Sequence, residues 1–183
     1  MSYALLSTGI ALWVLPHWFK RIAPGPRAAM GDAGKGIVAA LTVLGVVLMV
    51  IGYRGAPVDP VYAAPGWGVH LNNLLMLVAI FLFGAGSSKG RARGWFRHPM
   101  LLGFTVWSVA HLLVNGDLAS LMLFGGLGAW ALITMIVINR ATPDWHRPPA
   151  GAIGGDIRLV VITLVLFAVI TAIHSYFVWP FPG

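Results

Sequence analysis

Long apolar runs follow one another along almost the whole chain and decide what it can fold into. Each run is about as long as a helix must be to cross a hydrocarbon core of ~30 Å, which takes about 20 residues. Only short polar segments separate the runs, so no stretch is left for a separate soluble domain. The sequence therefore predicts an all-α polytopic membrane helix bundle, one domain over residues 1–183, with about six transmembrane helices over 2–19, 36–53, 69–86, 99–115, 117–138 and 157–178.

The composition supports the membrane assignment and removes several kinds of site. Charged residues make up 9% of the chain, whereas a soluble protein carries about 25%. Cysteine is absent, which excludes disulfides, thiolate metal ligands and haem attached covalently through a C-x-x-C-H motif. Glutamate is absent too, and the five acidic residues are aspartates in or beside the predicted loops. An isolated zinc ion, which needs three or four ligands, is therefore not expected at membrane depth.

The positive charges gather on one side of the predicted bundle. All but one of the 12 Lys and Arg residues lie in the predicted loops 20–35, 87–98 and 139–158, and the exception is Arg54. Because cytoplasmic loops are enriched in Lys and Arg, we expect these three loops in the cytoplasm and both termini outside. Topology and anionic lipid headgroups then account for the net charge of +7, so the sequence predicts membrane lipid, and no nucleic acid, as a partner.

A very short connection joins the fourth and fifth predicted helices. Pro99 suits the first position of the fourth helix, because its fixed backbone angle is already helical. Asn115 and Gly116 favour a left-handed turn that ends this helix. The side chain of Asp117 can cap the fifth helix by accepting a hydrogen bond from a free backbone N–H. These residues together predict a tight antiparallel hairpin.

The six histidines are the titratable, ligating groups at membrane depth, where such residues are unfavourable and often functional. His111 is the strongest candidate, since it lies ~18 Å along a helix that begins at Pro99. Gly103, Trp107 and His111 recur every four residues and form one stripe. A gap, a flat aromatic ring and an imidazole suit a flat macrocycle or a conjugated ligand. Alternatively, Gly103 allows a neighbouring helix to pack closely, and His111 forms a hydrogen bond within the bundle.

Other histidines are candidate partners for His111. His17 follows Pro16, whose missing N–H bends the first helix. That bend can direct His17 at a site, or it can mark a kinked helix end at the membrane interface. His70 shares a helix face with Asn73 and that face is expected to point inward. Two histidines from different helices, in a chain without cysteine, suit non-covalently bound haem, because imidazole is a common axial ligand.

The stretch from residue 97 to 117 carries a long motif. It reads Arg-His-Pro, then Gly and Trp four residues apart, then Ala-His and Asn-Gly-Asp. This pattern resembles the signature of the NnrU family of bacterial membrane proteins, which is related to plant 15-cis-zeta-carotene isomerase. The resemblance continues more weakly over nearly the whole chain, including His17 and His70. Within the motif itself it covers Arg97, His98, Pro99, Asn115 and Asp117.

The resemblance implies a multi-pass protein of a bacterial inner membrane that holds haem b non-covalently, with His17 and His111 as axial ligands of the iron. In the plant enzyme the haem is thought to catalyse cis-to-trans isomerisation of one double bond of a polyene, so an apolar small-molecule substrate is expected. The bacterial branch is associated by name with nitrate, nitrite and nitric oxide respiration. Ser108 stands where the isomerase has a cysteine, so a thiolate cannot replace an imidazole in this chain.

Depth in the membrane leaves the pairing of the ligands open. By helix rise, His17 lies ~21 Å and His111 ~12 Å from the outer surface. Two axial nitrogens on one iron stand about 4 Å apart, so this pair forms only if helix tilt and the Pro16 kink close the gap. His111 with His70 is the rival pair, because both lie toward the outer side.

Two other functions are compatible with the sequence. A non-catalytic membrane partner or scaffold would use the small-residue patch at 125–129 for close packing with another protein. A membrane methyltransferase of the isoprenylcysteine type also carries Arg-His-Pro before a helix with Gly and Trp. That enzyme class needs a Glu-containing cytoplasmic helix, however, and this chain has no Glu and a short, proline-rich segment at 139–158.

Overall fold

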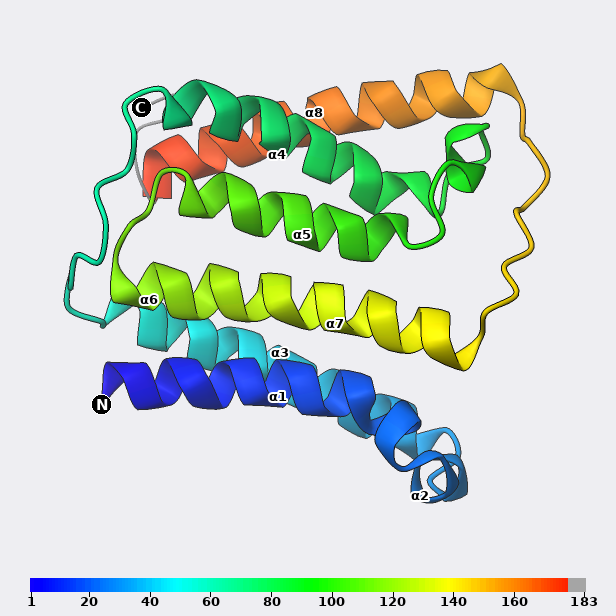
Figure 1. The fold of residues 1–183 in the computed structure, drawn as a ribbon, viewed down its shortest axis with the longest axis horizontal. Helices are drawn as coiled ribbons and strands as arrows, with labels where there is room; N and C mark the ends of the chain where they lie inside the picture. The colour runs from blue at the N-terminus through cyan, green and yellow to red at the C-terminus, as the bar shows by residue number, and fades with distance from the viewer. Residues whose placement is uncertain (178–183) are drawn as a thin grey trace.

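The structure, a computed structural model, describes residues 1–177, and those residues form a bundle of helices (Figure 1). The all-α fold is confirmed. Val178, the last residue of the sixth predicted span, lies outside the described residues. The elements in chain order are α1 (Ser2–Ile22), α2 (Pro24–Ala29), α3 (Ala33–Arg54), α4 (Gly68–Ala85), the 3-10 turn η1 (Ala92–Gly94), α5 (Pro99–Leu112), α6 (Leu118–Ser120), the π-helical turn η2 (Leu121–Gly125), α7 (Gly126–Ala141) and α8 (Ile153–Phe177).

Four helical segments among residues 1–177 are long and apolar enough to cross a membrane. They are α3, α4, the continuous segment Leu118–Ala141 and α8. Helix α5 has 14 residues, which gives it a length of ~21 Å and leaves it short of the ~30 Å hydrocarbon core. Helix α1 has 21 residues but carries the charged pair Lys20 and Arg21 in its last turn. The count of six spans stays a prediction for α1 and α5.

The helices are arranged in two groups joined by α7. Helix α1 packs along α3, while α4 packs against both α5 and α8. Figure 1 shows α7 between α5 and α1, and α7 contacts both of them. Helix α7 therefore connects the α1–α3 pair to the α4–α5–α8 group, and residues from both groups meet around it.

Small residues bring α1 and α3 close together. A Cβ atom added at Gly9 would lie 2.7 Å from the carbonyl oxygen of Gly45, and one added at Gly52 would meet the backbone of Leu6. Leu6 itself is fully buried and packs with Met49 in one core cluster. Close backbone approach through glycine is the usual way in which helices associate inside a membrane, where van der Waals packing replaces the hydrophobic driving force.

The outward faces of the bundle are apolar. In α8 only Leu159 and Thr163 are buried, and in α3 only Gly34, Gly45, Met49 and Gly52 are. The exposed large side chains of these two helices are almost all Val, Leu and Ile. A soluble protein rarely exposes an apolar surface of that extent, so lipid is the solvent that these faces fit.

The loop between α3 and α4, on the predicted outer side, forms hydrogen bonds with the connection between α5 and α6. The Tyr62 hydroxyl donates hydrogen bonds to the carbonyl oxygens of Leu112 and Asn115, and the N–H groups of Val61 and Tyr62 donate to the carbonyl oxygen of Gly116. The prediction of a left-handed turn at Asn115–Gly116 is wrong, because Gly31 is the only described residue with that backbone conformation. Glycine is needed at 116 for space, since a Cβ there would meet the Tyr62 carbonyl.

The predicted caps around α5 and α6 are present. Pro99 occupies the first turn of α5. The Asp117 carboxylate accepts hydrogen bonds from the Ser120 N–H at 2.9 Å and from the Ser120 hydroxyl at 2.6 Å. Pro99 thus marks the start of α5, which carries His111, and the Asp117 cap marks the start of α6, which follows α5 in the chain.

Candidate functional site

Two histidines have the same local geometry on different helices. Nδ1 of His17 lies 2.6 Å from the main-chain oxygen of Trp13 in α1, and Nδ1 of His111 lies 3.0 Å from that of Trp107 in α5. Because a carbonyl oxygen only accepts, each Nδ1 carries the hydrogen, and the neutral ring then has its lone pair on Nε2. Each imidazole also lies against the indole four residues before it, with ring centroids 4.7 and 5.0 Å apart.

His17 lies among tryptophans from two helices. It stacks on Trp13 and meets the edge of Trp130 from α7 at 5.2 Å. The indole N–H groups of Trp13 and Trp130 are buried and have no hydrogen-bond partner among residues 1–177. Buried donors in proteins are almost always paired, and an unpaired one is especially unfavourable in a membrane. Two buried N–H donors beside His17 are therefore without an acceptor among the described residues.

His111 is enclosed by rings near the C-terminal end of α5. It stacks on Phe124 with ring centroids 4.4 Å apart, and its carbonyl oxygen accepts a hydrogen bond from the Asn115 side chain at 2.9 Å. Phe124 belongs to the π-helical turn η2. Such turns are rare and often occur at functional sites, and this one carries the ring that stacks on the imidazole.

A set of rings from α1, α5, α7 and η2 links the two histidines through ring contacts, and we call it the aromatic column: Trp13, Trp130, Phe104, Trp107 and Phe124. The ring of Phe104 lies 5.6 Å from Trp13, 5.4 Å from Trp130 and 6.1 Å from Trp107. No ring contact joins His17 directly to His111 among the described residues. The structure therefore places both predicted iron ligands on one column but at opposite ends of it.

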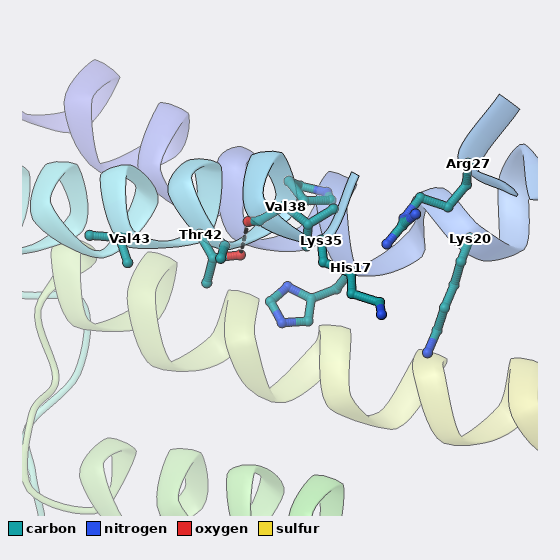
Figure 2. A pocket seen from close by; sticks show the side chains of 9 residues that line it. His17, Lys20, Arg27, Lys35, Val38, Thr42 and Val43 are labelled. Atoms are coloured by element: carbon teal, nitrogen blue, oxygen red, sulfur yellow. Dashed lines mark hydrogen bonds between the residues drawn. The ribbon is translucent and has the colours of Figure 1, made fainter. Parts of the chain in front are cut away.

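A groove opens beside His17 between α1 and α3 and has a volume of about 520 Å³ (Figure 2). That volume is in the range of small-molecule sites, which is about 300–1,000 Å³. Figure 2 shows the imidazole of His17 between apolar side chains of α3 and a group of basic side chains. The residues that line the groove are Pro16, His17, Lys20, Arg27, Lys35, Val38, Ala39, Thr42 and Val43.

The other predicted site residues lie elsewhere. His70 is exposed and has no ring contact with His111 among the described residues. Its neighbour Asn72 does point inward, where its side-chain N–H donates to the carbonyl oxygen of Ala110 at 2.8 Å. Gly103 is packed against α4, because a Cβ there would lie 2.9 Å from Phe83. In this structure Gly103 therefore admits a neighbouring helix.

The Arg-His-Pro motif ties two helix ends together on the predicted cytoplasmic side. Nε2 of His98 donates to the Asn139 side chain at 2.8 Å, and the Arg97 guanidinium donates to the Pro143 carbonyl oxygen and to both oxygens of Thr142. The start of α5 is thereby joined to the end of α7. This motif holds the helices that carry the aromatic column and does not contribute to the groove.

The described part of the chain has no cluster of side chains that could bind an isolated metal ion. Among residues 1–177 no group of three or more His, Asp or Glu side chains could hold a metal ion. A haem iron has a lower requirement, because the macrocycle supplies four nitrogens and the protein adds one or two axial ligands. The donor set of this chain, imidazole nitrogens without thiolates, fits that requirement.

Sequence reasoning missed the tryptophan that accompanies each histidine. The spacing Trp-x-x-x-His occurs twice, at 13–17 and at 107–111, and residues four apart share a helix face. That repetition was the available signal. The contributions of Phe104, Phe124 and Trp130 depend on how helices pair, which helical spacing does not specify.

Comparison with known proteins gives one result. The family model described as NnrU protein matches residues 5–180. No curated protein and no solved structure matched the chain. Because the match spans nearly the whole chain and includes both Trp-x-x-x-His segments, the family assignment does not depend on the motif at 97–117 alone. The chain belongs to the NnrU protein family.

Proposed function

We propose that the protein binds haem b non-covalently within the membrane and that His17 is an axial ligand of the iron. The observation that carries the proposal is the hydrogen bonding and the position of the His17 imidazole. Its Nδ1–H is held by the Trp13 carbonyl oxygen, its Nε2 has no partner among the described residues, and it lines a groove of about 520 Å³. A hydrogen bond from the far nitrogen is the usual way to orient a histidine ligand and to raise its basicity.

The surroundings of His17 suit a large flat group. Val38, Ala39 and Val43 line the apolar part of the groove, and the indole rings of Trp13 and Trp130 close the opposite side of the imidazole. A bound haem would supply an iron whose oxidation state can change and which can accept a further ligand. The chain would orient that iron through His17 and exclude water with the aromatic column.

The reaction that we propose is of the isomerase type. The resemblance to zeta-carotene isomerase suggests an apolar polyene substrate, which would reach the groove laterally from lipid. A link to nitrate, nitrite or nitric oxide respiration would use the same site with a small ligand on iron. We propose both of these uses of the site. We also propose that the protein lies in the inner membrane, crosses it six times and has both termini outside.

A second arrangement would place both histidines on one iron. The equivalent geometry of His17 and His111 favours it, since both imidazoles present an unpartnered Nε2. In that arrangement the rings of Phe104, Trp107 and Trp130, which link the two imidazoles, would have to move. We therefore put His17 first and expect substitution of His111 to decide between the two arrangements.

The test is an absorption spectrum of the detergent-purified protein, produced with ample haem and recorded oxidised and after reduction with dithionite. We expect a Soret band that shifts on reduction, with sharp reduced α and β bands only if a second histidine also binds the iron. A flat spectrum from folded protein would overturn the proposal. Co-purification of another membrane protein with that haem-free chain would then favour the non-catalytic partner or scaffold.

A further inference from the structure

The groove beside His17 has a basic end built from three separate elements. Lys20 comes from α1, Arg27 from α2 and Lys35 from α3, and all three line the same groove as His17. Figure 2 shows their side chains on one side of the imidazole, with Thr42 and Val43 on the other. The excess of positive charge on cytoplasmic loops explains why these residues are basic, but it does not explain why they meet at one groove.

These cations have few acidic partners of their own. Lys35 pairs with Asp32 at 2.8 Å, but both side chains are more than three-quarters exposed, and such a surface pair contributes little. No carboxylate pairs with Lys20 or Arg27 among residues 1–177. The Arg27 guanidinium makes one hydrogen bond, of 3.4 Å, to the Gly31 carbonyl oxygen. Like charges around one groove repel each other, and an anion bound between them would offset that repulsion.

We propose that Lys20, Arg27 and Lys35 bind the two propionate carboxylates of the haem whose iron is held by His17. This inference rests on the proposed function and adds the orientation of the haem, with its carboxylates toward the cytoplasmic side and its apolar edge toward Val38 and Val43. Lys20 follows His17 by three residues, a rise of ~4.5 Å along the same helix face. An anion beside the iron ligand is therefore within reach of a flexible lysine side chain.

The chemistry of the basic end matches carboxylates. Arginine binds a carboxylate through two parallel hydrogen bonds, and lysine adds a mobile point charge. At the membrane boundary long basic side chains keep their charged ends near water while their methylene groups cover apolar surface. A ligand with an apolar body and an acidic end would satisfy both parts of this groove at once.

The test compares haem with haem dimethyl ester, in which both propionates are esterified. Binding of each compound to the full chain in detergent is titrated by the Soret change, for the wild type and for the variant Lys20→Gln/Arg27→Gln/Lys35→Gln. The control variant is Lys89→Gln/Arg91→Gln/Arg140→Gln. It removes the same charge from exposed residues on the same predicted side, outside the groove.

We expect the groove variant to bind haem about tenfold or more weakly than the wild type does, with an unchanged spectrum at saturation. Its affinity for the dimethyl ester should equal that of the wild type, and the control variant should bind both compounds as the wild type does. The wild type should itself prefer haem to the ester. Equal affinity of the wild type for the two compounds would overturn the inference, as would equal weakening of both in the groove variant.

Failure of the proposed function has a different signature. A wild type that binds neither compound would refute the haem proposal itself. Anionic phospholipid retained by the wild type and the control, but lost from the groove variant in native mass spectrometry, would then assign the basic end to a lipid phosphate and overturn the propionate assignment.

Discussion

The imidazole of His17 stacks on the indole of Trp13 with ring centroids 4.7 Å apart, and its Nδ1–H donates to the Trp13 carbonyl oxygen at 2.6 Å. One residue thus fixes both the plane and the tautomer of the histidine. Pro16 precedes His17 within the helix and cannot donate a backbone hydrogen bond. The local sequence therefore leaves Nε2 of His17 without a hydrogen bond among residues 1–177, in a residue that lines the groove between α1 and α3.

Replacing His111 separates the two haem arrangements. We expect His111→Ala to keep the haem-to-protein ratio of the wild type, because the aromatic column, rather than a direct ring contact, links His111 to His17 among the described residues. Loss of its stacking on Phe124 should lower the free energy of unfolding by about 1–3 kcal/mol. The ratio is measured from haem absorbance on protein that elutes as one species in size exclusion. Loss of haem from that species, or a change from low to high spin, would show that both histidines bind one iron.

The α1–α3 contact can be tested at a glycine. A side chain at position 52 would meet the backbone of Leu6, whereas one at position 36 would meet nothing within 4 Å. We expect Gly52→Ala to lower the free energy of unfolding by about 1–3 kcal/mol, because overpacking forces the backbone to shift. Thermal unfolding followed by circular dichroism measures the effect, with Gly36→Ala on the same helix as the control. Equal melting temperatures of the two variants would refute the close contact.

The loop that carries Tyr62 should give the protein a stability that is lost at high pH. Burial and, secondarily, the negative charge of Asp117 raise the pKa of Tyr62 above its ordinary value. The fold thus favours the neutral phenol, whose contribution is full below a pH of about 10 and declines as the pH rises above it. Below that pH, Tyr62→Phe should be less stable by about 1 kcal/mol, because it loses the bond to Asn115.

Unfolding midpoints measured from pH 7 to 11 check this expectation. The difference between the wild type and Tyr62→Phe should shrink as the pH passes about 10, because the deprotonated phenol no longer donates. A difference that stays constant across the range would mean that the Tyr62 hydroxyl does not stabilise the loop between α3 and α4 in its neutral form.

The helices were predictable because their causes are local in the chain. Apolar runs indicated α3, α4 and α8, and Pro99 and Asp117 marked helix starts that the structure confirms. The end of α5 was less predictable, since the helix stops at Leu112 and the following turn is held by Tyr62 from a distant loop. Helix α2 lies in a segment that composition alone assigned to a loop.

The candidate site was predictable only in part. The cost of placing an imidazole in a membrane pointed to His111, and the proline kink pointed to His17. The aromatic column was not predictable, because contacts such as Phe104 with Trp130 need the pairing of α5 with α7. The same holds for the groove, because Lys20 and Lys35 line it together only when α1 pairs with α3.

The most direct test of the account is the haem content of His17→Ala beside His146→Ala. His146 is exposed in the segment between α7 and α8 and serves as a control for the loss of a histidine. We expect that His17→Ala, purified as a folded protein from cells supplied with haem, lacks the Soret band, whereas His146→Ala keeps it at wild-type intensity. A His17→Ala protein with the wild-type haem content and spectrum would contradict the assignment of His17 as the iron ligand.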